Sequence, residues 1–281
     1  MESMKGKRVV ITGPTSGIGK EIARELGSLG AQLILACRDT AKGEATAIEI
    51  LKDGGAKGAA VRQVDMSRQQ SIRDFARGIA EEFGRIDALV NNAGISRGPQ
   101  RRAESADGIE LTFATNVVGY FLLTLELMDV LKAGAPSRIV NVASSFASDL
   151  DLDDLQFARR PFEGMKAYAQ SKACDRLLTW ALARRLEGTR VTANAMAPGL
   201  VVDTGLYRDF TAEMTQPLRQ RAELTVAQGA DTAVWLASSP DVEGASDRFF
   251  YQRKEIPCAF RNRESEEKLW EICRELTHRA K

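Results

Sequence analysis

Tyr168 and Lys172 are the residues whose types and spacing first indicate chemistry. They lie four positions apart in a segment, residues 165–186, whose hydrophobic periodicity predicts a helix. Because side chains four apart share one face of a helix, we expect the lysine ammonium to lie beside the phenol. A neighbouring cation lowers the pKa of a phenol from its ordinary value of about 10, so this tyrosine can act as a general acid and base. The same pair is also common on solvated helix surfaces, so the rest of the chain has to decide between the two interpretations.

The composition is that of a globular protein. The chain has 281 residues, of which 44% are hydrophobic, and this is enough for one large α/β domain. The net charge of +1 and the dispersed basic residues give no reason to expect a nucleic acid partner. The sequence contains neither a signal peptide nor the run of about 20 apolar residues that a membrane helix needs. We therefore expect a cytoplasmic protein without a membrane anchor.

The histidine and cysteine content excludes several kinds of catalytic site. The one histidine is His278, close to the end of the sequence, so neither a Ser-His-Asp triad nor a histidine-based metal site is expected. The cysteines have no metal-ligand spacing, and we expect reduced thiols and no bound metal. These cysteines are Cys37, Cys174, Cys258 and Cys273.

A glycine-rich turn follows the first β-branched run, residues 9–12, and precedes a helical pattern. Glycines permit a tight turn and a close approach of backbone to a ligand, and the start of the helix offers free N–H groups to a pyrophosphate. The spacing is GxxxGxG rather than GxGxxG, but its place at the first strand–helix turn favours a nucleotide site. The candidate cofactor-binding residues in this turn are Gly13, Thr15, Ser16, Gly17, Ile18 and Gly19.

The residue after the second predicted strand, 32–37, indicates which dinucleotide is bound. Arg38 stands about 20 positions after the glycines, where the residue that faces the adenosine ribose is expected. A carboxylate there would favour NAD, whereas a guanidinium suits the 2′-phosphate of NADP(H). Asp39 comes next, and we interpret it as the N-cap of the following helix.

Small or polar residues also end the later predicted strands. Asn116 lies apart from them, among apolar residues of a long helical pattern, 105–131. Strands and helices alternate throughout, which predicts a single α/β domain over residues 1–281, with a doubly wound parallel sheet of about seven strands and helices on both faces. Because the carboxyl ends of parallel strands meet at one edge of the sheet, we expect the candidates to form one site. The strand-end candidates are Asp65, Met66, Asn92, Ala93, Gly94, Ser144, Pro198 and Gly199.

Taken together, these motifs resemble the short-chain dehydrogenase/reductase family. The resemblance runs from residue 7 to about residue 250. It rests on TGPTSGIG at 12–19, NNAG at 91–94, Asn116, Ser144, YAQSK at 168–172 and PG at 198–199. The stretches LACR and RIVNVASS and the insertion before Tyr168 are similar to the retinol-dehydrogenase-like branch. The resemblance implies a Rossmann fold and NAD(P)-linked interconversion of an alcohol and a carbonyl.

The resemblance also implies roles for single residues. Tyr168 matches the general acid and base, and Lys172 matches the residue that activates it and holds the nicotinamide ribose. Ser144, rather than Ser145, matches the hydroxyl that orients the substrate oxygen, and Asn116 matches the residue that anchors a water of the proton relay. The remaining matches are Asp65 and Met66 with adenine, and Asn92, Ala93 and Gly94 with the ribose and nicotinamide.

The substrate side of the site follows the family pattern less closely. The usual threonine falls where Asp203 stands, so either Asp203 or Thr204 is expected to meet the nicotinamide carboxamide. A substrate lid is expected at 203–224, where Leu206 and Phe210 have near-helical spacing and suit a bulky, mainly apolar substrate. An ordinary packed helix is the other interpretation of this segment.

The expected function is therefore an NADP(H)-dependent oxidoreductase acting on a small-molecule carbonyl or alcohol, in a homodimer or homotetramer. An insertion is expected at about 148–165, and its acidic stretch, residues 149–154, is interpreted as a solvated loop. Membrane-bound retinol dehydrogenases carry an N-terminal anchor, and this sequence starts at its first strand, so retinol itself is not the expected substrate. A second hypothesis is a non-catalytic NADPH-binding regulatory protein, because fold does not fix function. The complete set of Asn116, Ser144, Tyr168 and Lys172 favours the enzyme.

Overall fold

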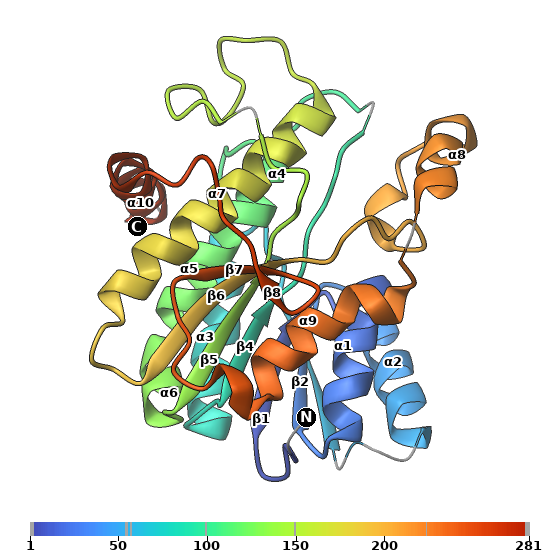
Figure 1. The fold of residues 1–281 in the computed structure, drawn as a ribbon, viewed down its shortest axis with the longest axis vertical. Helices are drawn as coiled ribbons and strands as arrows, with labels where there is room; N and C mark the ends of the chain where they lie inside the picture. The colour runs from blue at the N-terminus through green and yellow to red at the C-terminus, as the bar shows by residue number, and fades with distance from the viewer. Residues whose placement is uncertain are drawn as a thin grey trace.

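The centre of the fold is one eight-stranded sheet, seen in a computed structural model that describes residues 3–53, 56, 58–98, 100–148, 150–222 and 224–278. Its strands are β1 (Arg8–Thr12), β2 (Gln32–Cys37), β3 (Gly58–Gln63), β4 (Ala88–Asn91), β5 (Ser137–Val142), β6 (Val191–Ala197), β7 (Arg248–Tyr251) and β8 (Lys254–Glu255). They lie in the order β3-β2-β1-β4-β5-β6-β7-β8 (Figure 1). The first seven strands in sequence are parallel to their neighbours, and β8 pairs antiparallel with β7. The predicted parallel sheet is confirmed, with a short antiparallel edge strand added.

Helices cover both faces of the sheet. They are α1 (Gly17–Ser28), α2 (Thr40–Lys52), α3 (Gln69–Phe83), α4 (Leu111–Phe113), the π-helical turn η1 (Ala114–Val118), α5 (Gly119–Glu126), α6 (Met128–Ala133), α7 (Gly164–Arg185), the 3₁₀ turn η2 (Gly205–Tyr207), α8 (Ala212–Arg221), α9 (Val226–Ser238), the 3₁₀ turn η3 (Pro240–Val242) and α10 (Arg263–His278). Helices α1, α2 and α9 pack on one face, and α3, α5 and α7 pack on the other (Figure 1). None of the helices in the described ranges is long and apolar enough to cross a membrane.

The central strands are apolar because both faces of the sheet are covered. In β1 every residue after Arg8 is buried, and in β2 every residue after Gln32 is buried. Such continuous apolar runs are typical of parallel strands inside an α/β protein. The strand order reverses between β1 and β4, and the crevice outside the carboxyl ends of these strands is where open α/β sheets bind ligands.

Helix α7 carries the Tyr168–Lys172 pair and is buried along most of its length. One side of it packs on the sheet, and α10, which the sequence pattern did not reveal, packs on the other side. Trp270 of α10 contacts Phe121 of α5 edge to face, with ring centroids 4.8 Å apart. Because α10 shields it, α7 holds charged and polar side chains in an interior environment.

Two predicted helix starts can be compared with the structure. Asp39 is the N-cap of α2, since its carboxylate accepts a hydrogen bond from the backbone N–H of Lys42 at 3.1 Å, so that prediction is confirmed. The helical pattern expected from residue 105 was too long, because the helix begins only at Leu111. The Glu110 carboxylate caps it there by accepting from the N–H groups of Thr112 and Phe113.

Candidate active site

The glycine turn between β1 and α1 lies against the end of β4. Gly13 has a positive φ of 65°, and a Cβ on it would lie 2.9 Å from the Cα of Ala93. A Cβ on Gly19 would lie only 2.2 Å from the Asn92 amide nitrogen. Ser16 precedes α1 in an extended conformation without a side-chain capping bond. The first-turn N–H groups of α1 therefore form the kind of helix start that binds pyrophosphate.

Asn92 connects the end of β4 to this turn. Its side-chain amide donates to the carbonyl oxygens of Thr12 and Gly13, at 2.9 and 3.2 Å. The Thr12 hydroxyl in turn accepts from the N–H groups of Asn92 and Ala93, at 2.9 and 3.0 Å. The carboxyl ends of the two strands at the switch point are thus held together by Thr12 and by Asn92, and of these two Asn92 is a predicted cofactor contact.

The predicted adenosine contacts lie at the ends of β2 and β3. The Arg38 side chain is exposed and forms no ion pair with any other residue in the described part of the chain, while its carbonyl accepts from Gln63. The Asp65 carboxylate accepts from the N–H and hydroxyl of Ser67, at 3.0 and 2.7 Å, and so orders its own turn. Arg38 is therefore free to meet an anion.

Tyr168 and Ser144 come together at the carboxyl edge of the sheet. Tyr168 is buried on α7, and the Ser144 hydroxyl, just after β5, lies near enough to its phenol to lower the phenol pKa. Ser145 is exposed, whereas Ser144 is half-buried and also accepts from the N–H of Phe146 at 3.0 Å. The geometry agrees with the choice of Ser144 over Ser145.

Lys172 does not lie as the helix spacing suggested. Its ammonium donates to the carbonyl oxygen of Val142 and to the carboxylate of Asp175, both at 2.8 Å, and within the described ranges it makes no hydrogen bond to Tyr168. Burial raises the pKa of Tyr168 to about 12; the Ser144 hydrogen bond opposes this shift and the Asp175 charge adds to it. The phenol pKa is thus raised rather than lowered, because burial disfavours the phenolate and the Asp175 charge disfavours it further.

Asn116 lies fully buried in the π-helical turn η1. Its side chain accepts from the N–H of Ile95 and donates to the Ile95 carbonyl and to the Ser171 hydroxyl, at 2.9, 3.0 and 2.9 Å. The amide therefore ties the loop after β4 to α7. Both amide hydrogens are used in this way, and the water-anchoring role implied by the resemblance stays a prediction.

The segment predicted to be a substrate lid contains two elements, η2 and α8, instead of one helix. Thr211 ends the turn that follows η2 and caps α8, accepting from the N–H of Met214, so Leu206 and Phe210 precede α8. Thr204 lies against Gly17 of the glycine turn, where a Cβ would be 2.9 Å from it. Asp203 points outward to Arg219 at 2.8 Å. Of the two candidates left open for the carboxamide, Thr204 is the one beside the cofactor turn.

The lid also brings an aromatic pair to the site. Tyr207 and Phe210 contact edge to face with ring centroids 5.3 Å apart. Burial raises the pKa of Tyr207 to about 12, and the nearby Tyr168 adds to the shift, so the two phenols interact electrostatically. A groove of about 660 Å³ lies along the lid, and its lining includes Thr204, Tyr207, Phe210 and Arg219. Leu206 was predicted to face the substrate, but it does not line this groove.

The insertion before α7 is ordered by a buried acid. Asp154 accepts hydrogen bonds from the N–H groups of Ala158, Arg159 and Arg160, at 2.7 to 3.3 Å. Burial opposes its ionisation, but these N–H groups keep the pKa of Asp154 below its usual value. The Arg160 guanidinium lies 4.2 Å from the ring centre of Phe157. The solvated-loop interpretation was wrong for Asp154, and Asp149 at the start of this stretch lies outside the described residues.

Sequence reasoning missed Asp175, Arg176 and Tyr207. The first two follow Tyr168 by about two helical turns, so they share its side of α7, and that position was the available signal. The Arg176 guanidinium donates to the carbonyl oxygen of Ser144. Tyr207 had no signal beyond its place in the lid, between Leu206 and Phe210.

Comparison with known proteins agrees with this geometry. Residues 7–215 match the family model described as short chain dehydrogenase. The chain is 39% identical to retinol dehydrogenase 14 of Homo sapiens, over 96% of this chain and 85% of that protein. It is similar to the crystal structure of an uncharacterised protein from Mycobacterium paratuberculosis, with 32% identity, a TM-score of 0.78, and coverage of 99% and 96% of the two chains. A short chain dehydrogenase from Burkholderia cenocepacia J2315 in complex with NADP is 28% identical, with a TM-score of 0.71 and coverage of 89% and 97%.

Proposed function

The chain belongs to the short-chain dehydrogenase/reductase family, and from this premise we propose that it is an NADP(H)-dependent oxidoreductase that interconverts a carbonyl and an alcohol. One observation carries the proposal. The Ser144 hydroxyl lies near the buried Tyr168 phenol and acts on its pKa, at the sheet edge where the glycine turn also lies. A proton donor, an oxygen-orienting hydroxyl and a nucleotide turn at one edge are the parts that this reaction needs.

The residues present fit a nicotinamide dinucleotide. A Cβ on Gly13 would clash with Ala93 and one on Gly19 with Asn92, so glycine lets this turn pack against the end of β4. The start of α1 then offers its free N–H groups to a pyrophosphate. The exposed Arg38 guanidinium, which forms no ion pair with the residues that the structure describes, suits a 2′-phosphate, and this supports NADP(H) over NAD(H). When bound, the nicotinamide supplies or accepts the hydride. We propose that Thr204 binds the nicotinamide carboxamide, because Thr204 lies against Gly17 of the glycine turn.

Two side chains of this protein would act on the substrate oxygen, one by proton transfer and one by a hydrogen bond. In reduction Tyr168 gives its proton to that oxygen, and in oxidation it takes the proton back. Ser144 donates a hydrogen bond to the oxygen as negative charge develops on it. Arg176 keeps the Ser144 backbone in place from α7. The rate then depends on how the reactants are positioned, because hydride transfer needs the nicotinamide ring carbon and the substrate carbonyl carbon held close together.

For the substrate we propose a bulky, mainly apolar carbonyl or alcohol. Tyr207 and Phe210 supply apolar surface along the lid groove. Arg160, which lies in the insertion, pairs with Asp154 and donates to the Gln170 side chain, so it is not free to clamp a small anion. The relative named retinol dehydrogenase carries the name of a bulky apolar alcohol, which is the same substrate class. Burial of apolar surface at about 25 cal/mol per Å² would supply binding energy without many polar contacts.

A coupled binding and turnover experiment tests this function. The protein would be titrated with NADPH and NADH, and cofactor oxidation would then be followed with carbonyl compounds of rising apolar area. We expect turnover with NADPH, and kcat/KM values that rise with apolar area. NADPH binding without turnover across the whole panel would favour the regulatory protein, and faster turnover of small charged ketones would contradict the proposed substrate class.

A further inference from the structure

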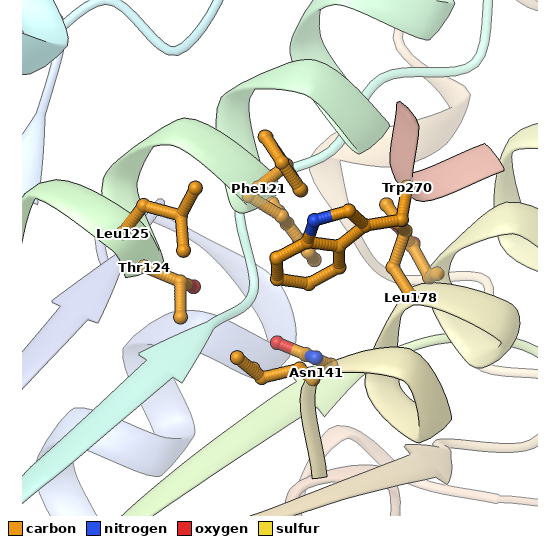
Figure 2. A pocket seen from close by; sticks show the side chains of 9 residues that line it. Phe121, Thr124, Leu125, Asn141, Leu178 and Trp270 are labelled. Atoms are coloured by element: carbon orange, nitrogen blue, oxygen red, sulfur yellow. The ribbon is translucent and has the colours of Figure 1, made fainter. Parts of the chain in front are cut away.

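The cavity beside α7 is too small for a cofactor or a substrate. It has a volume of about 20 Å³ and lies between α5, α7, α10 and β5. Figure 2 shows the side chains of Phe121, Leu178 and Trp270 around it. A space of this size holds about one water molecule. The groove of about 660 Å³ along the predicted lid is much larger, and it has charged side chains in its lining.

Arg208 lines that groove with a guanidinium that is only partly used. Its Nε atom donates to the Gly205 carbonyl oxygen at 2.8 Å, and this bond restrains the plane of the guanidinium. Among the residues that the structure describes, no carboxylate pairs with Arg208, and its two Nη groups have no hydrogen-bond partner. Arg219 in the same groove pairs with Asp203 at 2.8 Å. Arg208 is therefore available to an anion, whereas Arg219 is already neutralised.

Gly205 lies between this guanidinium and the glycine turn. A Cβ on Gly205 would lie 3.0 Å from the Ser16 hydroxyl oxygen and 3.8 Å from Nη2 of Arg208. Thr204, the residue before it, lies against Gly17 of the same turn. The segment that begins at Thr204 thus packs beside the start of α1 and brings the Arg208 guanidinium close to it.

The start of α1 and Arg208 attract charge of the same sign. The first turn of α1 contains no acidic residue, and Ser16 before it makes no side-chain capping bond. The free N–H groups of this turn carry partial positive charge, and the Arg208 guanidinium adds a full charge beside them. A guanidinium also binds phosphate oxygens in pairs. These donors suit an anion with several oxygens, such as a diphosphate, better than the apolar substrate proposed for the same groove.

We propose, on the basis of the dinucleotide cofactor proposed above, that Arg208 binds the cofactor diphosphate and so fastens the segment 204–221 beside the glycine turn. Arg208 and Arg38 then bind different anionic groups of NADP(H). Arg208 meets the diphosphate, which NAD(H) also carries, and Arg38 meets the 2′-phosphate, which NAD(H) lacks. Arg208 thus contributes affinity for both cofactors without a preference between them.

Equilibrium binding of three ligands to Arg208→Gln tests this assignment. The ligands are NADPH, NADH and ADP-ribose, which carries the diphosphate but neither the nicotinamide nor the 2′-phosphate. We expect all three Kd values to rise by a similar factor, about tenfold to a hundredfold, because one charge-assisted contact to phosphate is lost. Because Arg208 is exposed, the variant should fold like the wild type. Arg208→Lys keeps the charge without the planar fork and should recover part of the affinity.

Arg221→Gln is the matched control for the binding experiment. It removes the same charge from the last turn of α8, outside the lining of the groove. Each Kd should change less than about twofold in this variant, because solvent and salt screen a distant exposed charge.

The outcomes separate this inference from the proposed function. Kd values in Arg208→Gln equal to those of Arg221→Gln would overturn the inference while the function stands. A loss confined to NADPH would place Arg208 at the 2′-phosphate, and a loss that spares ADP-ribose would place it at the nicotinamide, so either result would also overturn it. A wild-type protein that binds neither NADPH nor NADH would overturn the proposed function itself and this inference with it.

Amide hydrogen exchange gives a second measurement, which does not depend on affinity. At saturating NADPH, exchange in residues 204–221 should slow in the wild type and in Arg221→Gln, and it should slow less in Arg208→Gln. Saturation in every sample removes the effect of weaker binding. Equal protection of this segment in all three proteins would show that Arg208 does not fasten it to the cofactor and would overturn that part of the proposal.

Discussion

The Arg176 guanidinium donates a hydrogen bond to the backbone carbonyl of Ser144, so α7 holds the loop that carries the Ser144 hydroxyl. The guanidinium carbon lies 3.7 Å from the ring centre of Phe249 and 5.3 Å from that of Phe260. Its Nη1 atom also contacts the Cys258 sulfur at 3.7 Å. Burial lowers the pKa of Arg176, and the Cys258 contact opposes this shift. Strand β7 and the segment before α10 are thereby connected to the active site.

Replacing Arg176 with methionine should slow catalysis more than it weakens cofactor binding. The aliphatic stem stays between the rings, but the bond to the Ser144 carbonyl is lost. A small displacement of a positioning group commonly costs about tenfold to a hundredfold in rate. We expect kcat for carbonyl reduction to fall within this range and the Kd for NADPH to change less than about threefold.

Arg185→Met is the matched control for this variant. Arg185 lies on the same helix over the ring of Trp270, at 4.0 Å, and pairs with Glu267 away from the site. Its loss should lower Tm with little change in kcat. Equal losses of kcat in the two variants would mean that Arg176 acts through general stability and not through Ser144.

Tyr168→Phe should abolish turnover while the protein still binds NADPH. The ring and its packing remain, and the titrating hydroxyl is removed. General acid–base catalysis commonly contributes about a hundredfold to ten-thousandfold, so kcat should fall by at least that lower figure. Tyr207→Phe removes the neighbouring phenol of the lid and serves as the control. Retention of more than about a tenth of wild-type activity in Tyr168→Phe would assign the proton to another group.

The raised pKa of Tyr168 predicts opposite pH dependences for the two directions. Below a pKa of about 12 the phenol stays protonated, so kcat/KM for reduction should be nearly constant between about pH 6 and 9. Oxidation needs the phenolate, whose fraction rises about tenfold with each pH unit below the pKa. Initial rates in both directions across this range are the measurement. A fall in reduction centred near neutral pH would show that the working phenol titrates there.

The sequence was sufficient for the sheet and for most of the site because both depend on local signals. Continuous apolar runs predicted the parallel strands, and small or polar residues at their ends placed Gly13, Asn92 and Ser144 at one edge of the sheet. The N-cap role of Asp39 could also be predicted locally. Its carboxylate accepts from the free N–H of Lys42, three residues later, and this contact does not depend on the tertiary structure.

The orientation of Lys172 could not be predicted in this way. Helix spacing gives the face on which a side chain lies, and Lys172 can turn toward Tyr168 or toward Asp175 from the same face. The choice depends on α10, which shields this part of α7 and keeps the Asp175 carboxylate dry. The start of α8 could not be predicted for a related reason. The apolar residues of the predicted lid segment have near-helical spacing throughout, but Thr211 caps α8 and so begins a separate helix there.

Arg38→Ala should reduce the preference for NADPH over NADH. A charge-assisted hydrogen bond to phosphate contributes about 1.5–3 kcal/mol, which corresponds to about one to two decades of affinity. We expect the Kd for NADPH to rise by this amount and the Kd for NADH to stay nearly constant. Arg24→Ala, on the outer face of α1 where Arg24 pairs with Glu21, is the control. Equal wild-type affinities for the two cofactors would contradict the assignment of Arg38 to the 2′-phosphate.

Phe210→Ala should weaken the binding of bulky apolar substrates and leave small ones unaffected. The Phe210 ring lies against Gly98, where a Cβ would be only 2.7 Å from a ring carbon, and it contacts Tyr207 edge to face. This aromatic pair packs the segment before α8 against the loop after β4. Its loss removes apolar contact area, and a change of about 1.4 kcal/mol would raise KM about tenfold.

The control for the lid is Met214→Ala, a truncation on the exposed side of α8, where Met214 is 38% exposed. We expect it to change KM less than about twofold for every substrate, because this side chain does not line the groove. In Phe210→Ala the ratio of KM between a polycyclic and a small ketone should rise about tenfold at similar kcat. If both variants change KM equally, or if Phe210→Ala affects small and bulky substrates alike, the aromatic pair does not select the substrate by size.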